Sequence, residues 1–145
     1  MDERRTLGEF VHLPVAKNVL QGIANGVYQE KEILRLEAQL RSEVAGTPFY
    51  IISRALIIAV SKDIIKTDKI REEPGQPLID KDKDFIEGLH QGWNNSQIIE
   101  NLGWRLEEVY KYRRRVFRAL EVKSDYQVVI WEARRRKRER ALKDV

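Results

Sequence analysis

The residues with the most evident chemistry are the basic side chains of one short stretch, VYKYRRRVFRAL, which runs from Val109 to Leu120. Five of its twelve residues are Lys or Arg. Guanidinium and ammonium groups carry hydrogen-bond donors and a positive charge, so they can bind phosphate oxygens and the O6 and N7 acceptors of guanine. Helices that only face water carry the same charges. The question is whether this stretch presents a basic face that a polyanion can reach.

Placed on a helix at about 100° per residue, the stretch has two faces. The apolar residues on one side are Leu106, Val109, Val116 and Leu120. The residues on the other side are Lys111, Arg114, Arg115 and Arg118, together with Glu107. The apolar face would anchor the helix and leave the basic face accessible. This division favours a binding helix over the alternative of a merely solvated, Arg-rich helix.

The charge of the chain is concentrated around this helix. The 145 residues have a net charge of only +4. Residues 105–145 contain fourteen Lys/Arg and seven Asp/Glu, whereas residues 1–104 contain thirteen and sixteen. A basic partner surface is therefore expected in the last third of the chain.

Three helices, separated by glycine-containing turns, are expected to position the basic face. Asp80 is a suitable N-cap for the first helix. Asn94 or Asn95 can cap the second helix, which stops at Gly103. The third helix would span about 106–121. Two helices joined by a short turn that contains Gly are typical of the helix-turn-helix, whose second helix enters the major groove of DNA.

A series of positions in this region follows a known pattern without a gap. The pattern is Leu, Gly, Asn, Glu-Ile-Ala, a Leu-x-Ile turn, Thr-Val-Lys-x-His, and Asn-Ile-x-x-Lys-Leu-x-Val. The matching residues are Leu78, Gly92, Asn95, Ile98, Leu102, Val109, Arg113, Val116, Leu120 and Val122. Residues 78 to about 134 thus resemble the LuxR/FixJ/GerE-type DNA-binding domain of bacterial transcription factors, which implies a four-helix domain.

The departures from the family pattern lie near the expected DNA surface or at the start of the third helix. They are Trp104 at the aliphatic turn position, Arg105 at the capping Ser, Glu108 at the Thr, Tyr110 at the Lys, Tyr112 at the His and Arg115 at the Asn. The fold is therefore better supported than a map of contacts, and the family's target sequence does not carry over.

The resemblance implies that Tyr110, Lys111 and Arg114 reach base edges. The central position of Lys111 and Arg114 on the basic face independently favours donation to guanine. The predicted phosphate contacts are Asn95, Ser96, Arg105, Tyr112, Arg113, Arg115 and Arg118. Glu107 and Glu108 interact favourably with the positive N-terminal end of the helix dipole. They could also repel phosphate or accept a hydrogen bond from cytosine N4, so their effect on DNA binding is left open.

The spacing of apolar residues in the N-terminal half of the chain predicts a helical hairpin. Its first arm spans about 15–45, with Gly22 and Gly26 marking close packing, a kink or a break. In the AGTP motif, Gly46 suits a position just after a helix, Thr47 an N-cap and Pro48 a first turn.

The second arm, about 48–65, is apolar nearly all round and must be buried on several sides. It is expected to pack on the C-terminal half or on a second subunit. A homodimer is favoured, and the alternative is a helix central to a monomer core.

These expectations divide the chain into two regions. Residues 1–68 form a helical region for dimerisation or partner binding, 69–77 a linker rich in Pro and charge, and 78–145 the helix-turn-helix domain. The domain ends in a basic helix from Ser124 to about Lys143, with Val128, Val129 and Ala133 on a packing face. The run RRRKRERALK at its end is either an additional phosphate-binding arm or an exposed helix or frayed tail.

Several chemistries are not expected. The chain has no cysteine, and no P-loop, dinucleotide fingerprint or nucleophile elbow occurs. DKDKDFIEGLHQ is not a calcium loop, because Phe85 stands at its sixth position and Gln91 at its twelfth. His12 and His90 are far apart in sequence, and each has a Glu three residues before it but no second His nearby to complete a set of metal ligands. We therefore expect no enzyme activity, no metal site and no cofactor.

No secretory or membrane-spanning segment is expected. The N-terminus lacks a long apolar run, and YIISRALIIAV is short and interrupted by Arg54. The expected location is the cytoplasm of a bacterium or of a cell that a phage has infected, with no membrane partner.

The sequence predicts an all-α, dimeric, sequence-specific transcriptional regulator that binds double-stranded DNA. The two recognition helices of a dimer would read half-sites about 34 Å apart, or a multiple of that. One alternative is a module like sigma-factor region 4, or a phage late-gene regulator, acting through RNA polymerase or another regulator. The other is a protein-interaction adaptor whose helix-turn-helix no longer reads DNA.

Overall fold

The computed structural model describes residues 6–143, which form helices and no strand. The helices are α1 (Leu7–Phe10), α2 (Pro14–Asn25), α3 (Glu30–Leu40), α4 (Pro48–Ser61), α5 (Asp80–His90), α6 (Asn95–Leu102), α7 (Leu106–Leu120) and α8 (Asp125–Lys143). The predicted all-α class is confirmed for the described residues. The outer ends of the two predicted regions, residues 1–5 and 144–145, lie outside them.

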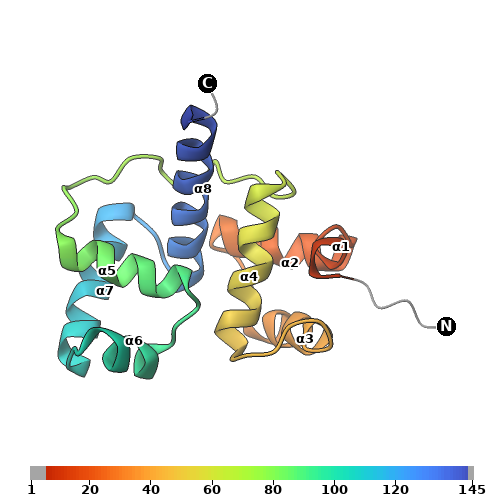
Figure 1. Ribbon diagram of the computed structural model, residues 1–145. Coiled ribbons are helices and arrows are strands. Elements are labelled where there is room, and N and C mark those ends of the chain that lie inside the picture. Colours follow the sequence, from red (N-terminus) through yellow and green to blue (C-terminus); the bar gives the residue numbers. More distant parts are fainter. Residues whose placement is uncertain (1–5, 144–145) are drawn as a thin grey trace.

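The helices form two groups with α8 between them (Figure 1). The first group contains α1 to α4, and the second contains α5, α6 and α7. The most extensive contacts of α8 are with α4 on one side and α5 on the other. The buried side chains of both groups belong to one continuous hydrophobic core.

Capping residues in the sequence mark helix ends correctly at several places. The Thr47 hydroxyl accepts a hydrogen bond from the Tyr50 amide at 3.2 Å, at the start of α4. At the start of α6, Asn94 Oδ1 accepts from the Gln97 amide at 2.9 Å. Gly103 ends α6 in the left-handed conformation, with φ of 68°. These signals lie within a few residues of the ends they fix.

Two of the predicted caps are wrong. Asp80 is the first residue of α5 instead of its N-cap, because Ile79 occupies that place and its amide donates to the Asp82 carboxylate at 3.0 Å. Gly46 does not follow a helix directly, since α3 already ends at Leu40.

The long first arm predicted for residues 15–45 is also wrong, because the chain breaks into α2 and α3. Gly26 adopts φ of 75°, and the Val27 amide then donates to the Gly22 carbonyl oxygen at 2.8 Å. A Cβ atom at Gly22 would lie 2.6 Å from the Val27 carbonyl oxygen. Of the alternatives left open for the two glycines, the break is correct, and the predicted hairpin is a set of helices.

The apolar surface of α4 is covered within the same chain. The buried residues of this helix include Ile51, Ile52, Ala55, Leu56, Ala59 and Val60. They pack against α8, α3, α2 and α1. Packing on the C-terminal half was one of the expected solutions, and α4 therefore gives no reason to invoke a second subunit.

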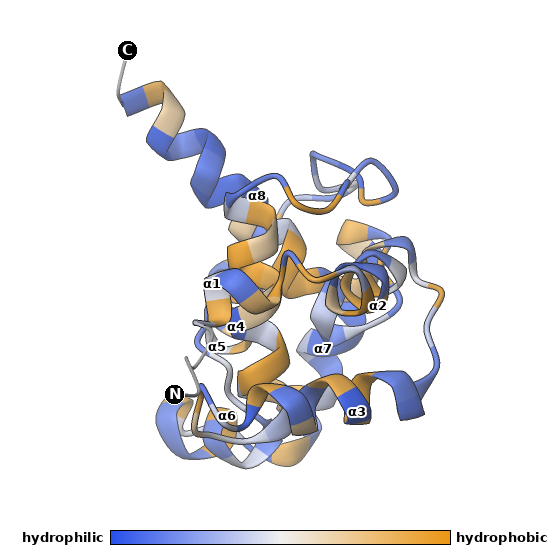
Figure 2. Ribbon diagram, turned by 90° about the vertical axis from the view of Figure 1, so that its right-hand side faces the viewer, coloured by the Kyte–Doolittle hydropathy of each residue, from blue (hydrophilic) through white to orange (hydrophobic). Residues whose placement is uncertain are grey.

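The predicted packing face of Val128, Val129 and Ala133 on α8 is confirmed, and the buried part of the helix is wider than predicted. Every residue from Gln127 to Ala133 is buried. Figure 2 shows the change along this helix, from a part that is mostly apolar inside the molecule to a polar end that extends beyond it. A helix buried on all sides at one end must be surrounded by other helices.

The predicted linker, residues 69–77, is irregular as expected, but it is held against α8. The whole segment between α4 and α5 contains buried Ile65 and Ile70. The indole nitrogen of Trp131 donates to the carbonyl oxygen of Glu72 at 3.1 Å. These contacts fix the path of the chain between the two groups of helices.

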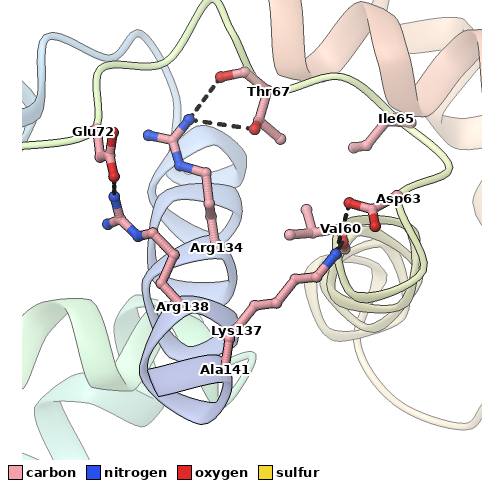
Figure 3. Close-up of a pocket in the computed structure, with 9 residues that line it drawn as sticks. All are labelled: Val60, Asp63, Ile65, Thr67, Glu72, Arg134, Lys137, Arg138 and Ala141. Atoms are coloured by element: carbon pink, nitrogen blue, oxygen red, sulfur yellow. Dashed lines mark hydrogen bonds and ion pairs between the residues drawn. The ribbon is translucent and has the colours of Figure 1, made fainter. Parts of the chain in front are cut away.

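Arg134 of α8 makes the largest set of hydrogen bonds to this segment. Its guanidinium donates to the carbonyl oxygens of Thr67, Ile70 and Arg71, the first at 2.7 Å and the second at 2.8 Å. It also donates to the Thr67 hydroxyl at 3.3 Å, and Figure 3 shows its approach to Thr67. Arg134 thus replaces the hydrogen bonds that a regular element would give these carbonyl groups.

The second group of helices also touches α4 directly, at the C-terminal end of α5. The Arg54 guanidinium donates to the carbonyl oxygen of His90, the last residue of α5. It lies 5.2 Å from the centre of the Tyr50 ring. Gly92, with φ of 86°, packs so closely on Tyr50 that a Cβ atom would lie 2.5 Å from the ring. The positive charge of Arg54 lies at the negative, C-terminal end of the α5 helix dipole, where it stabilises the helix.

We predict that Arg134→Met lowers the free energy of unfolding by about 2 kcal/mol, because carbonyl groups of the 66–72 segment lose their donors. Lys143→Met is the matched control, since Lys143 is an exposed cation on the same helix. The measurement is urea unfolding followed by tryptophan fluorescence. Equal stabilities of the two variants would show that Arg134 does not hold the segment.

We also predict a pH dependence from His90. Burial, with Arg136 and then Arg54, lowers its pKa below the ordinary 6.5, while Glu132 and Glu87 act in the opposite direction. As the pH falls below about 6.5, the unfolded chain takes up a proton that the folded chain resists, so stability decreases. The free energy of unfolding should therefore rise with pH between the lowered pKa of His90 and 6.5.

The test compares His90→Gln with His12→Gln, which removes an exposed histidine. Urea unfolding between about pH 7 and about pH 5 should show a smaller loss of stability in His90→Gln than in the wild type. The His12→Gln variant should keep the wild-type loss. Parallel curves for all three proteins would contradict the effect of His90.

Candidate nucleic-acid interface

α6 and α7 are joined by a tight turn. Residues 103–105 separate them, and the left-handed Gly103 begins the turn, with no atom within 4 Å of the place where a Cβ would stand. The Arg105 amide donates to the Glu108 carboxylate at 3.1 Å, which fixes the first turn of α7. α5, α6 and α7 pack on one another, so a helix, a short turn and a longer helix stand together on the support of α5.

The apolar face of α7 is buried largely as predicted. Val109, Val116 and Leu120 are fully buried. Tyr112 is also buried, with its ring centre 5.1 Å from that of Trp104. Leu106 departs from the prediction, because 44% of it is exposed. Tyr112 was predicted to contact phosphate, but its side chain forms part of the core instead.

The opposite face of α7 is open to solvent. Its exposed residues are Glu107, Tyr110, Lys111, Arg114 and Arg118. Within residues 6–143, no carboxylate forms an ion pair with the three basic side chains of this face. We call Tyr110, Lys111, Arg114 and Arg118 the basic stripe. The structure brings together all three predicted base contacts and one predicted phosphate contact on this stripe.

Arg115 points away from the basic stripe, toward α5. Its Nε lies 3.1 Å and its Nη2 3.3 Å from the two oxygens of Asp82. Asp82 is 1% exposed, and the hydrogen bond to it raises the pKa of Arg115. The prediction of a phosphate contact at Arg115 is corrected, because this guanidinium neutralises a buried carboxylate.

Arg113 is held in a similar way by the start of α8. Its Nε donates to the Asp125 carboxylate at 2.9 Å, and its Nη2 donates to Asn95 Oδ1 at 2.5 Å. The guanidinium also lies over the Phe85 ring, 5.3 Å from its centre. Arg113 and Asn95, both predicted to contact phosphate, instead link α5, α6, α7 and α8.

The remaining predicted phosphate contacts stay accessible. Ser96 lies exposed in the first turn of α6, and Arg105 is exposed in the turn before α7. Both residues precede the basic stripe in sequence, one on α6 and the other in the turn between α6 and α7. First-turn amides of a helix are suited to phosphate oxygens, as are exposed guanidinium groups.

The two acidic residues at the start of α7 have different positions. Glu108 accepts from the Lys81 ammonium group at 3.0 Å and from the Arg105 amide, and these interactions lower its pKa. The same contact with Glu108 raises the pKa of Lys81. Glu107 is exposed beside the basic stripe. Glu108 therefore serves the helix start, whereas Glu107 lies where a polyanion would approach.

The basic run of α8 is largely occupied by internal partners. Glu132, 4% exposed, accepts from Arg135 and Arg136. Arg138 pairs with Glu72, and Lys137 lies 2.6 Å from Asp63 (Figure 3). The alternative of a phosphate-binding arm therefore finds little free charge in residues 134–138.

Two carboxylates that organise the site were not identified from sequence. In the sequence, Asp82 belongs to DKDKDFIEGLHQ, which is not a calcium loop, and no pattern predicts a role in binding for Asp125. For Asp82 a signal exists, because it stands three and four residues before buried Phe85 and Ile86 and therefore on the same helix face. For Asp125 there is none, since its contacts depend on how α8 approaches α7.

Other kinds of site find no support in residues 6–143. No three side chains of His, Asp or Glu gather in a way that would hold a metal ion there. No helix of that part combines the length and the apolar character needed to cross a bilayer.

Neighbouring arginines of α7 should separate structural from binding roles. Arg115→Met is expected to lower the free energy of unfolding clearly, because it leaves the buried Asp82 carboxylate without its partner. Arg114→Met should change it by less than about 0.5 kcal/mol, as for most exposed sites. Urea unfolding measures both, and equal losses would mean that Arg115 is not the counter-ion that fixes α7 on α5.

Comparisons of this chain with protein-family models, with curated proteins and with solved structures find no match. The likeness to the LuxR/FixJ/GerE family thus stands on the residues of the chain alone. What α6 and α7 can bind follows from their geometry and charge.

Proposed function

We propose that this protein is a transcriptional regulator that binds double-stranded DNA in a sequence-specific manner, with α7 in the major groove. The observation that carries the proposal is the unpaired basic stripe on α7, directly after the tight turn at Gly103. Other cations of α7, such as Arg113 and Arg115, have acidic partners. Free donors on the exposed face of a supported helix are suited to a polyanion.

The dimensions of the stripe agree with those of DNA. At about 1.5 Å per residue, Tyr110 and Arg118 are about 12 Å apart along the helix axis. An α-helix with its side chains is about 10–12 Å across, which fits the major groove, about 12 Å wide, so the stripe can lie along the groove. The buried side of α7 is fixed by α5 and α8, so the stripe would not have to become ordered when it binds.

The proposed contacts are fewer than those predicted from sequence. Tyr110, Lys111 and Arg114 would contact base edges, with Lys111 and Arg114 donating to guanine and Tyr110 offering an aromatic ring and a hydroxyl. The proposed phosphate contacts are Ser96, Arg105 and Arg118. Glu107 would discourage an approach that brings phosphate against the centre of the stripe, and it could accept from cytosine N4.

Membership of the LuxR/FixJ/GerE family is part of the proposal. Its support is the order of α5, α6, α7 and α8, with α7 in the place of the recognition helix. The length of α8 and its contact with α4 are additions to that pattern. The proposal concerns one reading helix in each chain, and a two-fold assembly is not needed to cover α4.

The test is fluorescence anisotropy with a mixed-sequence duplex at two salt concentrations, followed by selection of bound sequences from a random pool. Lys111→Ala combined with Arg114→Ala should weaken binding to the selected sequence by at least about tenfold, since each good base contact contributes about 1–3 kcal/mol. Arg118→Gln should instead weaken binding to all sequences and reduce the slope of affinity against salt by about one.

Lys17→Ala combined with Lys31→Ala is the matched control, because it removes the same charge from exposed positions on α2 and α3. It should change the affinity by less than about threefold. If the Lys111 and Arg114 double variant binds as tightly as the wild type, α7 is not the reading helix. Duplex binding that is absent or does not depend on salt would favour the protein-interaction adaptor.

A further inference from the structure

A cavity of about 410 Å³ lies where α4, α5 and α8 meet, away from the basic stripe. Its apolar wall contains Ile57 and Ile58 of α4 and Ala133 of α8. Cavities of this size commonly take small ligands, in which an apolar wall and a few polar groups share the recognition. The wall on α4 is only partly covered, since both isoleucines are intermediate in exposure.

The polar side of the cavity is positively charged. Lys62, Arg136 and Arg140 line it, and no carboxylate does. Arg136 is neutralised by Glu87 and Glu132. Lys62 and Arg140 have no acidic partner within the described residues, so two positive charges stand at an apolar wall. Such a combination favours an anion that also carries an apolar body.

Two other cavities on the surface of α8 differ, because carboxylates belong to their lining. In the cavity of Figure 3, Lys137 faces Asp63 and Arg138 faces Glu72, so these cations are already paired. A cavity of about 320 Å³ between α5 and α8 includes the carboxylate of Glu132 in its lining. A lining that has cations and no carboxylate therefore distinguishes the cavity at the junction of α4, α5 and α8 from these two.

The imidazole of His90 also lines this cavity. Its Nδ1 is buried and has no hydrogen-bond partner in the described part of the chain. Burial, with Arg136 and Arg54, lowers the pKa of His90. An anion close to this ring would supply both an acceptor and a negative charge, and it would therefore raise that pKa.

The C-terminal ends of α4 and α5 approach the same place and carry partial negative charge. The carbonyl oxygen of Val60 accepts from Lys137 at 3.2 Å, and that of His90 accepts from Arg54. These two acceptors are therefore occupied, and they leave the positive charges of Lys62 and Arg140 available.

We propose that this cavity binds a small organic acid, whose carboxylate lies among Lys62, His90 and Arg140 and whose apolar body contacts Ile57 and Ile58. An inorganic anion would leave the apolar wall without a contact, and a neutral hydrocarbon would leave the cations without one. The site does not overlap the basic stripe, because none of these residues belongs to it.

The experiment is isothermal titration calorimetry of the full chain with octanoate, 3-phenylpropionate, 1-octanol and acetate. At least one of the two acids with an apolar body should bind with a Kd of about 1 mM or tighter. Octanol, which has no carboxylate, and acetate, which has no apolar body, should each bind at least about tenfold more weakly. In NMR titrations, the bound acid should raise the pKa of His90.

Lys62→Gln combined with Arg140→Gln should weaken binding of the acid by at least about fivefold. Lys66→Gln combined with Lys143→Gln removes the same charge from exposed positions and should leave the affinity within about twofold. The proposal is overturned if neither acid binds below about 10 mM, or if octanol binds as well as octanoate. It is likewise overturned if the first variant keeps wild-type affinity or if saturation leaves the pKa of His90 unchanged.

Discussion

The structure depends on the burial of the first half of α8. All residues from Gln127 to Ala133 are buried, so this helix needs neighbours at every angle, and α4 and α5 supply most of them. Two polar residues enter the core with it. Gln127 donates to the Ala24 carbonyl oxygen at 3.1 Å and accepts from the Lys123 amide, while Glu132 is held by two arginines. Since an unpaired buried polar group costs about 1–3 kcal/mol, these partners make the central position of α8 possible.

The same packing decides which basic residues can bind a partner. Arg113, Arg115 and Arg134 all donate to acceptors of other elements, and the first two meet carboxylates on both sides of α7. Arg114 stands between them in sequence but faces solvent. A count of positive charges cannot separate these roles. The partner acids and carbonyl groups, which come from distant parts of the chain, determine whether a guanidinium is structural or free.

Much of the fold could be predicted because it depends on local chemistry. The Thr47 and Asn94 caps and the left-handed Gly103 act within a few residues of the helix ends that they fix. The buried face of α7 follows from the spacing of its apolar residues. By contrast, the break at Gly26 depends on the approach of Val27 to Gly22, for which the sequence allowed several readings.

Less could be predicted about α8 and about the candidate site. The run after Ala133 is so rich in charge that the helix suggests a surface position, yet its arginines pair with Glu132 and with carbonyl groups of the segment before α5. Of the ten residues predicted to contact DNA, Asn95 and three residues of α7 (Tyr112, Arg113 and Arg115) have internal roles for the same reason. The neighbours of the three α7 residues lie on α5, α6 and α8 or in the turn before α7, and no pattern within α7 reveals them.

The attachment of α7 has a mechanical consequence. Asp82 of α5 and Asp125 of α8 hold the helix through Arg115 and Arg113, which lie within one turn, and only a short connection, residues 121–124, separates α7 from α8. α8 in turn packs along α4. A partner that displaces α4 must therefore either break its contact with α8 or move α8 along with it. In the second case the Asp125 carboxylate would carry the displacement of α8 to α7, and the Asp82 carboxylate of α5 would oppose it.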